Sequence, residues 1–121
     1  MQGKIICPDG CGMDIKNELK VLIADVEKEL GFELESNSGA RCDKYNATIV
    51  GSIAGDAHTL GLAIDAKVDP DSADGREKIA RLIEALQKRG VRRYGDGMGK
   101  HKYLHFDRAD TLPTPRWWFY L

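Results

Sequence analysis

The stretch that begins at Asp56 constrains the fold most, because it carries a carboxylate into an apolar segment. Alternation predicts a β-strand that ends near Val68, with Asp65 on one face and Ile64 on the other. A carboxylate inside a buried strand is unfavourable unless a charged or hydrogen-bonding group meets it. The chain must therefore fold so that such a group reaches Asp65.

Two histidines are candidates to meet this carboxylate. His58 precedes Asp65 by seven residues (65 − 58), and His105 lies in a second alternating segment, Tyr103–Asp107. Imidazole nitrogen and carboxylate oxygen are ordinary zinc ligands, and a catalytic zinc has three protein ligands and an open position. The three residues therefore form a candidate site for one Zn²⁺. The alternative for each histidine is a hydrogen-bonded structural role.

Length and charge limit the class of protein. A chain of 121 residues is expected to form one domain over residues 1–121, and we expect a monomer. The 18 basic and 19 acidic residues give a net charge of −1, which argues against nucleic-acid and membrane partners. The first residues lack the apolar region of a signal peptide, so we expect synthesis in the cytoplasm.

The three cysteines leave two interpretations open. Cys7, Cys11 and Cys42 are an odd number, which excludes a complete disulfide framework. A metal site of three cysteines and one histidine is one interpretation. The favoured interpretation is that they are small buried or turn residues, one pair of which could oxidise.

The rest of the chain predicts helices and strands around these segments. Apolar residues at helical spacing predict one helix capped by Asp14 and ended by Gly31. A second helix is opened by Ser72 or Asp74 and ended by Gly90. The other expected elements are a strand over 32–36, a short helix within 41–50, a strand over 91–94 and a Gly-rich hairpin loop over 95–100. The aromatic tail over 113–121 is expected to pack over the sheet; the less favoured alternative is an exposed patch.

Four motifs together resemble a known family, the zinc peptidases of the M15 group. They are Ser38-Gly39-Ala40-Arg41-Cys42, Tyr45-Asn46, His58-x-x-Gly61-x-Ala63-x-Asp65 and His105-Phe106-Asp107. The group includes D-alanyl-D-alanine carboxypeptidases and phage L-alanyl-D-glutamate endolysin peptidases, and the likeness is greatest to its small C-terminal peptidase domain. The resemblance spans the chain from the first helix to Tyr120. It implies an α+β fold with a small central antiparallel sheet flanked by helices, similar to hedgehog and D-Ala-D-Ala peptidase domains.

The resemblance also implies roles for individual residues. His58, Asp65 and His105 match the three zinc ligands of the family. Arg41 matches the arginine that binds and polarises the scissile carbonyl or its oxyanion, a contact that stabilises the transition state. Asp107 is expected to orient a ligand or to lie behind it.

The general base is the position at which this chain departs from the family. Relatives place a carboxylate three residues before the last ligand, or a histidine two residues before it. Here those positions hold Lys102 and Tyr103. A protonated lysine cannot accept a proton, so the base must lie elsewhere. The candidates are Asp96, His101 and Asp107.

These observations predict a zinc metallopeptidase that hydrolyses peptidoglycan stem peptides at a bond involving a D-amino acid. Both a carboxypeptidase and an endolysin-type endopeptidase of the kind phages use suit the pattern. Without a signal peptide, the enzyme would reach the cell wall after release or by another export route. The alternative is a non-catalytic zinc-binding interaction or structural module on the same scaffold, as in hedgehog signalling domains.

Overall fold

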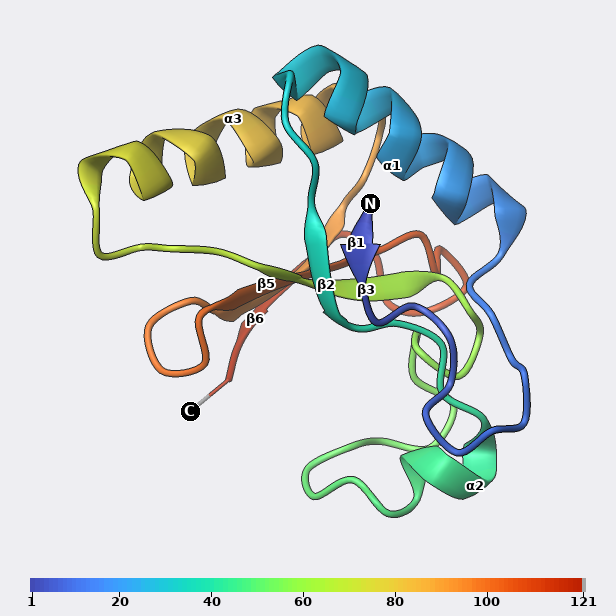
Figure 1. Ribbon diagram of the computed structural model, residues 1–121. Helices are drawn as coiled ribbons and strands as arrows, with labels where there is room; N and C mark the ends of the chain where they lie inside the picture. Colours follow the sequence, from blue (N-terminus) through green and yellow to red (C-terminus); the bar gives the residue numbers. More distant parts are fainter. Residues whose placement is uncertain (121) are drawn as a thin grey trace.

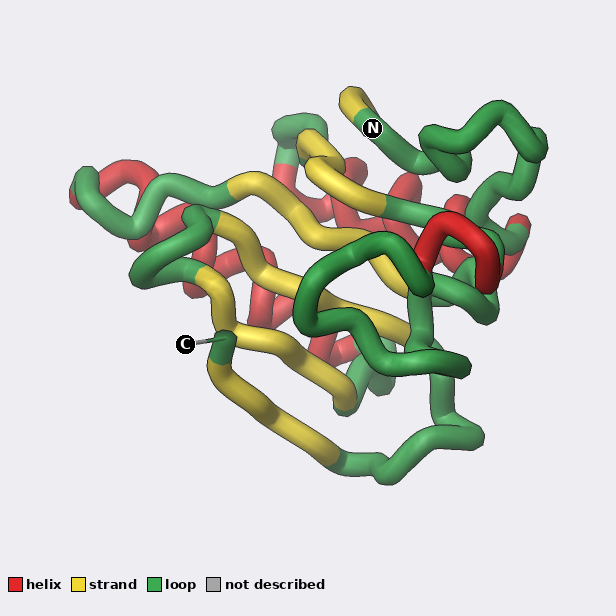
Figure 2. The backbone as a smooth tube through the Cα atoms, turned by 90° about the horizontal axis from the view of Figure 1, so that it is seen from below, coloured by secondary structure: helices red, strands yellow, loops and turns green. Residues whose placement is uncertain are grey.

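The computed structural model describes residues 1–120, which form one sheet and three helices. The elements are β1 (Gln2–Gly3), α1 (Asn17–Leu30), β2 (Glu35–Ser38), α2 (Asp43–Asn46), β3 (Ala63–Lys67), α3 (Ala73–Lys88), β4 (Arg93–Gly97), β5 (Tyr103–Asp107) and β6 (Arg116–Phe119). The strand order is β1-β2-β3-β5-β4-β6. The two long helices, α1 and α3, cover one face of the sheet, and α2 with its neighbouring loops lies on the other side (Figures 1 and 2).

The α+β class is as predicted, but the sheet is larger than predicted and is mixed. Its centre is antiparallel, with β3 and β4 both paired to β5. Its edges are parallel, because β1 pairs in parallel with β2 and β6 pairs in parallel with β4. The expectation of a small antiparallel sheet was therefore wrong at both edges. A two-residue strand has no period to detect, and consecutive aromatic residues in β6 hide the alternation of a strand.

The core lies between the sheet and the two long helices. Ile64 on β3 and Leu104 and Phe106 on β5 are fully buried, as the alternation of both strands predicted. The apolar stripes of the helices pack onto them, and their buried members are Leu19, Leu22, Ile23, Val26 and Leu30 on α1 and Ile79, Leu82, Ala85 and Leu86 on α3. Because side chains alternate along a strand, the residues between the core positions of β3 and β5 face away from the helices.

The helix starts were predicted correctly for α3 and wrongly for α1. The Ser72 hydroxyl accepts a hydrogen bond from the Gly75 N–H at 2.9 Å and caps α3. Helix α1 begins only at Asn17, and its cap position, Lys16, makes no side-chain cap bond. The Asp14 carboxylate is engaged elsewhere, because it accepts from the Ile15 N–H at 2.7 Å.

Strands β2 and β4 both begin later than predicted. The Leu34 N–H donates to the Glu27 carboxylate at 2.7 Å, so the chain is still tied to α1 where a strand was expected. In the same way the Val91 N–H donates to the carbonyl of Leu86 in α3. Strand β4 then runs through Gly95 and into the predicted hairpin loop, as far as its last residue at position 97.

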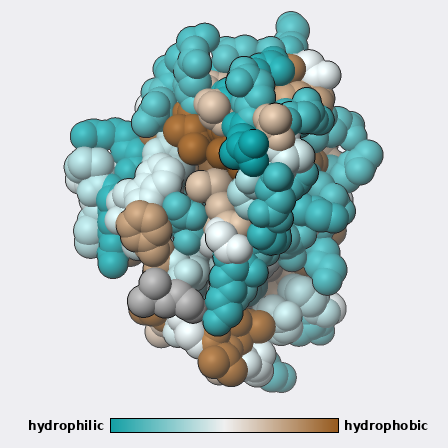
Figure 3. All heavy atoms as spheres, turned by 90° about the vertical axis from the view of Figure 1, so that its left-hand side faces the viewer, coloured by the Kyte–Doolittle hydropathy of each residue, from teal (hydrophilic) through white to brown (hydrophobic). Residues whose placement is uncertain are grey.

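Within residues 1–120, no helix combines the length and the apolar character that crossing a bilayer requires. On the face shown in Figure 3, hydrophilic side chains predominate and hydrophobic ones form separate patches. This face therefore presents no continuous apolar surface.

Candidate metal centre

The strand register brings two of the predicted ligands directly opposite each other. Asp65 on β3 pairs with His105 on β5, and both point to the face that the helices leave uncovered. His58 reaches them from the turn before β3. The Asp65 Oδ1 atom lies 3.3 Å from Nε2 of His58 and 3.0 Å from Nδ1 of His105. The three ligand atoms lie within 4.8 Å of one another, and all three residues are buried.

The two imidazole rings are held so that one nitrogen of each faces Asp65. Nδ1 of His58 lies 2.7 Å from the carbonyl oxygen of Gly39, which can only accept, so this nitrogen carries the hydrogen. Nε2 of His58 therefore presents a lone pair, and it is buried without a hydrogen-bond partner in the described part of the chain. A buried, unpartnered nitrogen that points at a carboxylate and a second histidine is suited to bind a metal ion.

His105 is oriented from behind by a second carboxylate. Its Nε2 lies 2.7 Å from Oδ2 of Asp107, so Nε2–H donates there and Nδ1 remains on the side of Asp65. Oδ1 of Asp107 accepts from Nε of Arg93 at 2.8 Å and from the Ala109 N–H at 3.0 Å. A carboxylate behind a ligating histidine fixes its tautomer and raises its basicity. Both oxygens of Asp107 are therefore engaged, one by His105 and the other by Arg93 and Ala109.

The electrostatics of the cluster favour positive charge beside Asp65. Burial lowers the pKa of His105, but the hydrogen bonds to Asp107 and Asp65 outweigh this and raise it to about 9. Burial likewise raises the pKa of Asp65, and the neighbouring rings of His105 and His58 reverse this and hold it below its ordinary value. A divalent cation at the same position would be stabilised by the same carboxylate.

Arg41 lies at the edge of this cluster. Its backbone N–H donates to the His58 carbonyl at 3.1 Å, which ties the two segments together. Its side chain is half-buried, and its Nε atom has no hydrogen-bond partner among the residues that the structure describes. Burial raises the pKa of Tyr103, the charge of Asp65 raises it further, and the charge of Arg41 opposes both. The charges of Arg41 and Asp65 therefore act on the same tyrosine, in opposite directions.

The sequence as a whole matches a family. A model described as Peptidase M15 matches residues 6–107, a range that contains Arg41, the three candidate ligands and Asp107. The chain belongs to the M15 peptidase family. M15 peptidases are zinc-dependent, and the buried nitrogen of His58 and the oriented His105 fit that metal. No curated protein and no solved structure matches the chain.

The three candidate bases of this M15 peptidase lie in different places. Asp96 pairs with Leu104, a core residue, so its carboxylate faces away from the metal centre and accepts from the Met98 N–H. Asp107 lies behind His105. His101 is exposed in the turn between β4 and β5, and its ring centroid lies 5.8 Å from that of Tyr103. His101 and Asp107 both lie on the side of the sheet that carries the centre, but both oxygens of Asp107 are engaged by other groups.

Lys102 does not approach the metal centre. It has a left-handed backbone, with φ of 58°, and precedes β5. Its Nζ lies 2.9 Å from the Asp71 carboxylate, in the turn that leads to α3. Lys102, which occupies the position of the general base in relatives, therefore points to the turn that precedes α3.

Aromatic residues beside the centre of this M15 peptidase were missed in the sequence. The Trp118 ring lies 5.0 Å from the His105 ring, and the Tyr103 and Tyr120 rings lie 5.3 Å apart. A Cβ atom at Gly95 would come within 2.7 Å of Trp118 and Tyr120. We call the rings of Tyr103, Trp118 and Tyr120 the aromatic wall. In the sequence, its signal was the pair of glycines at positions 95 and 97 together with the aromatic tail, two features that we interpreted separately.

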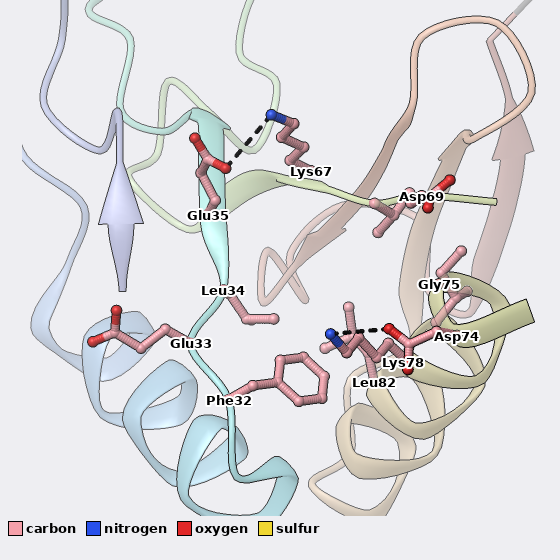
Figure 4. A pocket seen from close by; sticks show the side chains of 12 residues that line it. Phe32, Glu33, Leu34, Glu35, Lys67, Asp69, Asp74, Gly75, Lys78 and Leu82 are labelled. Carbon is pink, nitrogen blue, oxygen red and sulfur yellow. Dashed lines mark ion pairs between the residues drawn. The ribbon is translucent and has the colours of Figure 1, made fainter. Parts of the chain in front are cut away.

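A cleft on the helix side is separate from the metal centre. It has a volume of about 310 Å³ and lies between the start of β2, the end of β3 and α3, as Figure 4 shows. Phe32 and Leu82 contribute apolar surface, and two ion pairs, Lys67–Glu35 and Lys78–Asp74, lie at its margin. None of its lining residues belongs to the metal centre.

Proposed function

We propose that this M15 peptidase is a zinc-dependent enzyme that hydrolyses peptidoglycan stem peptides at a bond involving a D-amino acid. The observation that carries the proposal is the pair of histidines that each direct one ring nitrogen at Asp65. Their tautomers are set by Gly39 and Asp107, so the cluster is organised for a metal before any metal binds. His58, Asp65 and His105 would hold Zn²⁺ and leave a position open for water and substrate.

The residues around the metal centre have separate roles in the proposed reaction. Zn²⁺, when bound, supplies Lewis acidity and lowers the pKa of a water ligand toward about 7. Arg41 binds the carbonyl oxygen of the scissile bond and stabilises the negative charge that develops on it. Asp107, itself held by Arg93, keeps the ring of His105 in place.

We assign proton transfer to His101. It is exposed beside Tyr103, on the side of the sheet that carries the metal centre, and histidine is the side chain that most often serves as a general base. The ring centroids of His101 and Tyr103 lie 5.8 Å apart. Asp96 and Asp107 are occupied by other contacts.

The substrate assignment rests on the family motifs and on the character of the surface beside the centre. The aromatic wall of Tyr103, Trp118 and Tyr120 offers a flat surface for the peptide. We further propose that the topology is similar to that of hedgehog and D-Ala-D-Ala peptidase domains, and that the protein is a monomer with a single domain. The enzyme would reach the bacterial cell wall after release or by another export route.

Zymography on purified cell wall tests the proposal. The unmutated protein should clear the wall, and a chelator should stop clearing until zinc is restored. Mass spectrometry of the soluble fragments then identifies the bond and separates carboxypeptidase from endopeptidase action. Lys102→Ala is the matched control, because it changes a nearby charge that points away from the centre.

A non-catalytic zinc-binding module is the second candidate. The observation in its favour is that Lys102 replaces the family base and that Asp96 faces the core side of the sheet. If the protein retains its zinc and releases no wall fragment in the same assay, the binding module becomes the better assignment and the peptidase proposal fails.

A further inference from the structure

A second group of metal-binding side chains lies outside the metal centre. Cys7, Asp9 and Cys11 come from the loop that precedes α1, and Cys42 is the N-cap residue of α2. One ligand atom from each of these four residues lies within 4.8 Å of the others. We propose that this group, the cysteine cluster, binds a structural Zn²⁺ through three thiolates and the Asp9 carboxylate.

The spacing of the sulfur atoms suits a tetrahedral metal. The Sγ atoms of Cys7 and Cys42 lie 3.7 Å apart. Two sulfurs at tetrahedral positions on a zinc ion with bonds of about 2.3 Å are about 3.8 Å apart, whereas a disulfide bond is about 2.0 Å. The Asp9 carboxylate spans the pair, with Oδ1 3.2 Å from the Cys7 sulfur and Oδ2 2.9 Å from the Cys42 sulfur. The fourth ligand is therefore a carboxylate, where the sequence had suggested a histidine.

Backbone donors point at two of the sulfurs. The Cys42 N–H donates to Sγ of Cys7, and the Tyr45 N–H donates to Sγ of Cys42, each at 3.4 Å. Three thiolates and a carboxylate exceed the charge of one Zn²⁺, and such N–H donors offset that excess.

The loop itself is folded without a core of its own. Residues 8–12 are all exposed, so apolar burial contributes little to their order. The Asp9 carboxylate accepts from the Cys11 N–H at 2.9 Å, and the Cys7 N–H donates to the Met13 carbonyl at 2.8 Å. Gly10 takes a φ of 82°, which allows the chain to turn back so that Cys11 rejoins Cys7. A metal bound here would supply the stabilisation that burial does not.

The cysteine cluster also connects to the metal centre through the backbone. The Ala40 N–H donates to the Ile5 carbonyl at 2.9 Å, and a Cβ atom at Gly39 would come within 2.6 Å of Ile5. The segment held in this way carries the Gly39 carbonyl that orients His58, and it continues into Arg41. Zinc in the cysteine cluster would therefore fix the loop that positions Arg41.

Zinc content of the full chain, purified under reducing conditions, tests the proposal. Two occupied sites predict about two zinc equivalents in the unmutated protein and about one in His105→Ala. Cys11→Ser should also retain about one equivalent, and the double variant about none. Reconstitution with Co²⁺ gives an independent measurement. Thiolate-to-cobalt absorption should be present in the unmutated protein and in His105→Ala, and lost in Cys11→Ser.

Two results would overturn the proposal. One is a single zinc equivalent in the unmutated protein, lost in His105→Ala, with three thiols free to titrate. The other is a Cys7–Cys42 disulfide in the intact mass of the reduced preparation. If Cys11→Ser fails to fold, the absence of thiolate-to-cobalt absorption in His105→Ala refutes the site by itself. None of these measurements depends on peptidase activity, so this inference and the proposed function can fail separately.

Discussion

The metal centre and the cysteine cluster both gather ligand atoms within 4.8 Å, but they are built in different ways. Asp65 and His105 are buried on paired strands, and Asp107 orients one of them from behind. Asp9 and Cys11 are exposed on a loop that is held mainly by its own hydrogen bonds. The ligands of the metal centre are therefore held in place by the sheet, whereas a metal bound in the cysteine cluster would order the loop that carries its ligands. Removing metal should therefore abolish activity at the first site and loosen structure at the second.

Replacement of a ligand in the metal centre should have the largest effect. In His105→Ala we expect no measurable hydrolysis of the cell wall, because the zinc loses one of its three ligands and Asp107 no longer has a ligand to orient. Zinc analysis and zymography measure the two effects. Far-ultraviolet circular dichroism should remain that of the unmutated protein, since the core faces of β3 and β5 are unchanged. Full activity in this variant would refute the ligand assignment.

Replacement of groups beside the metal should lower activity and leave zinc in place. Arg41→Ala should lower kcat/KM by about 10²–10³-fold, because an oxyanion contact is lost. Arg76→Ala, which removes an exposed arginine on α3, is the matched control. An Arg41→Ala variant with unchanged kcat/KM and a full complement of zinc would exclude the assigned role.

The base assignment can be separated from the ligands in the same way. His101→Gln should lower kcat by about 10²-fold or more and spare zinc binding, because a base transfers protons but does not hold the metal. Asp96→Asn should have little effect, because its side chain faces the core side of the sheet. If the two variants behave in the opposite manner, the strand register of β4 does not describe the active protein.

The support behind His105 should have a smaller effect. Asp107→Asn keeps the size of the side chain and removes its charge, so zinc affinity should fall by about 10–100-fold. Competition with a metal-binding dye measures it. An unchanged affinity would show that the hydrogen bond between Asp107 and His105 does not contribute to metal binding.

Lys102→Ala should have the smallest effect. The ion pair between Lys102 and Asp71 is exposed, so its loss should change the free energy of unfolding by about 1 kcal/mol or less. Activity should remain within about twofold of the unmutated protein, since no contact with the metal centre is removed. Chemical denaturation and zymography check both. An inactive Lys102→Ala variant would mean that this side chain turns toward the centre during turnover.

Much of the fold was predictable from local patterns. The bounds of β5 and nearly all of β3 were predicted because a period of two is clear in each segment, and the helix stripes were predicted because their apolar residues recur at helical spacing. The three candidate ligands were found in the same way. A buried carboxylate in a strand needs partners, and only three histidines exist in the chain.

The remaining features were decided by contacts between distant segments. Strand β6 pairs with β4, and Gly95 leaves room for the rings of Trp118 and Tyr120, more than twenty residues further along the chain. Arg93 is buried where Asp107 lies opposite it in the neighbouring strand and where the Pro113 carbonyl accepts a second hydrogen bond from it. Asp9 meets Cys42 because β1 and the following loop run beside the segment after β2. By itself the sequence determined periodic elements and the residue types of a metal site. The tertiary structure decided the edges of the sheet, the support behind His105 and the direction of each candidate base, because these depend on which strands become neighbours and local periodicity does not encode that.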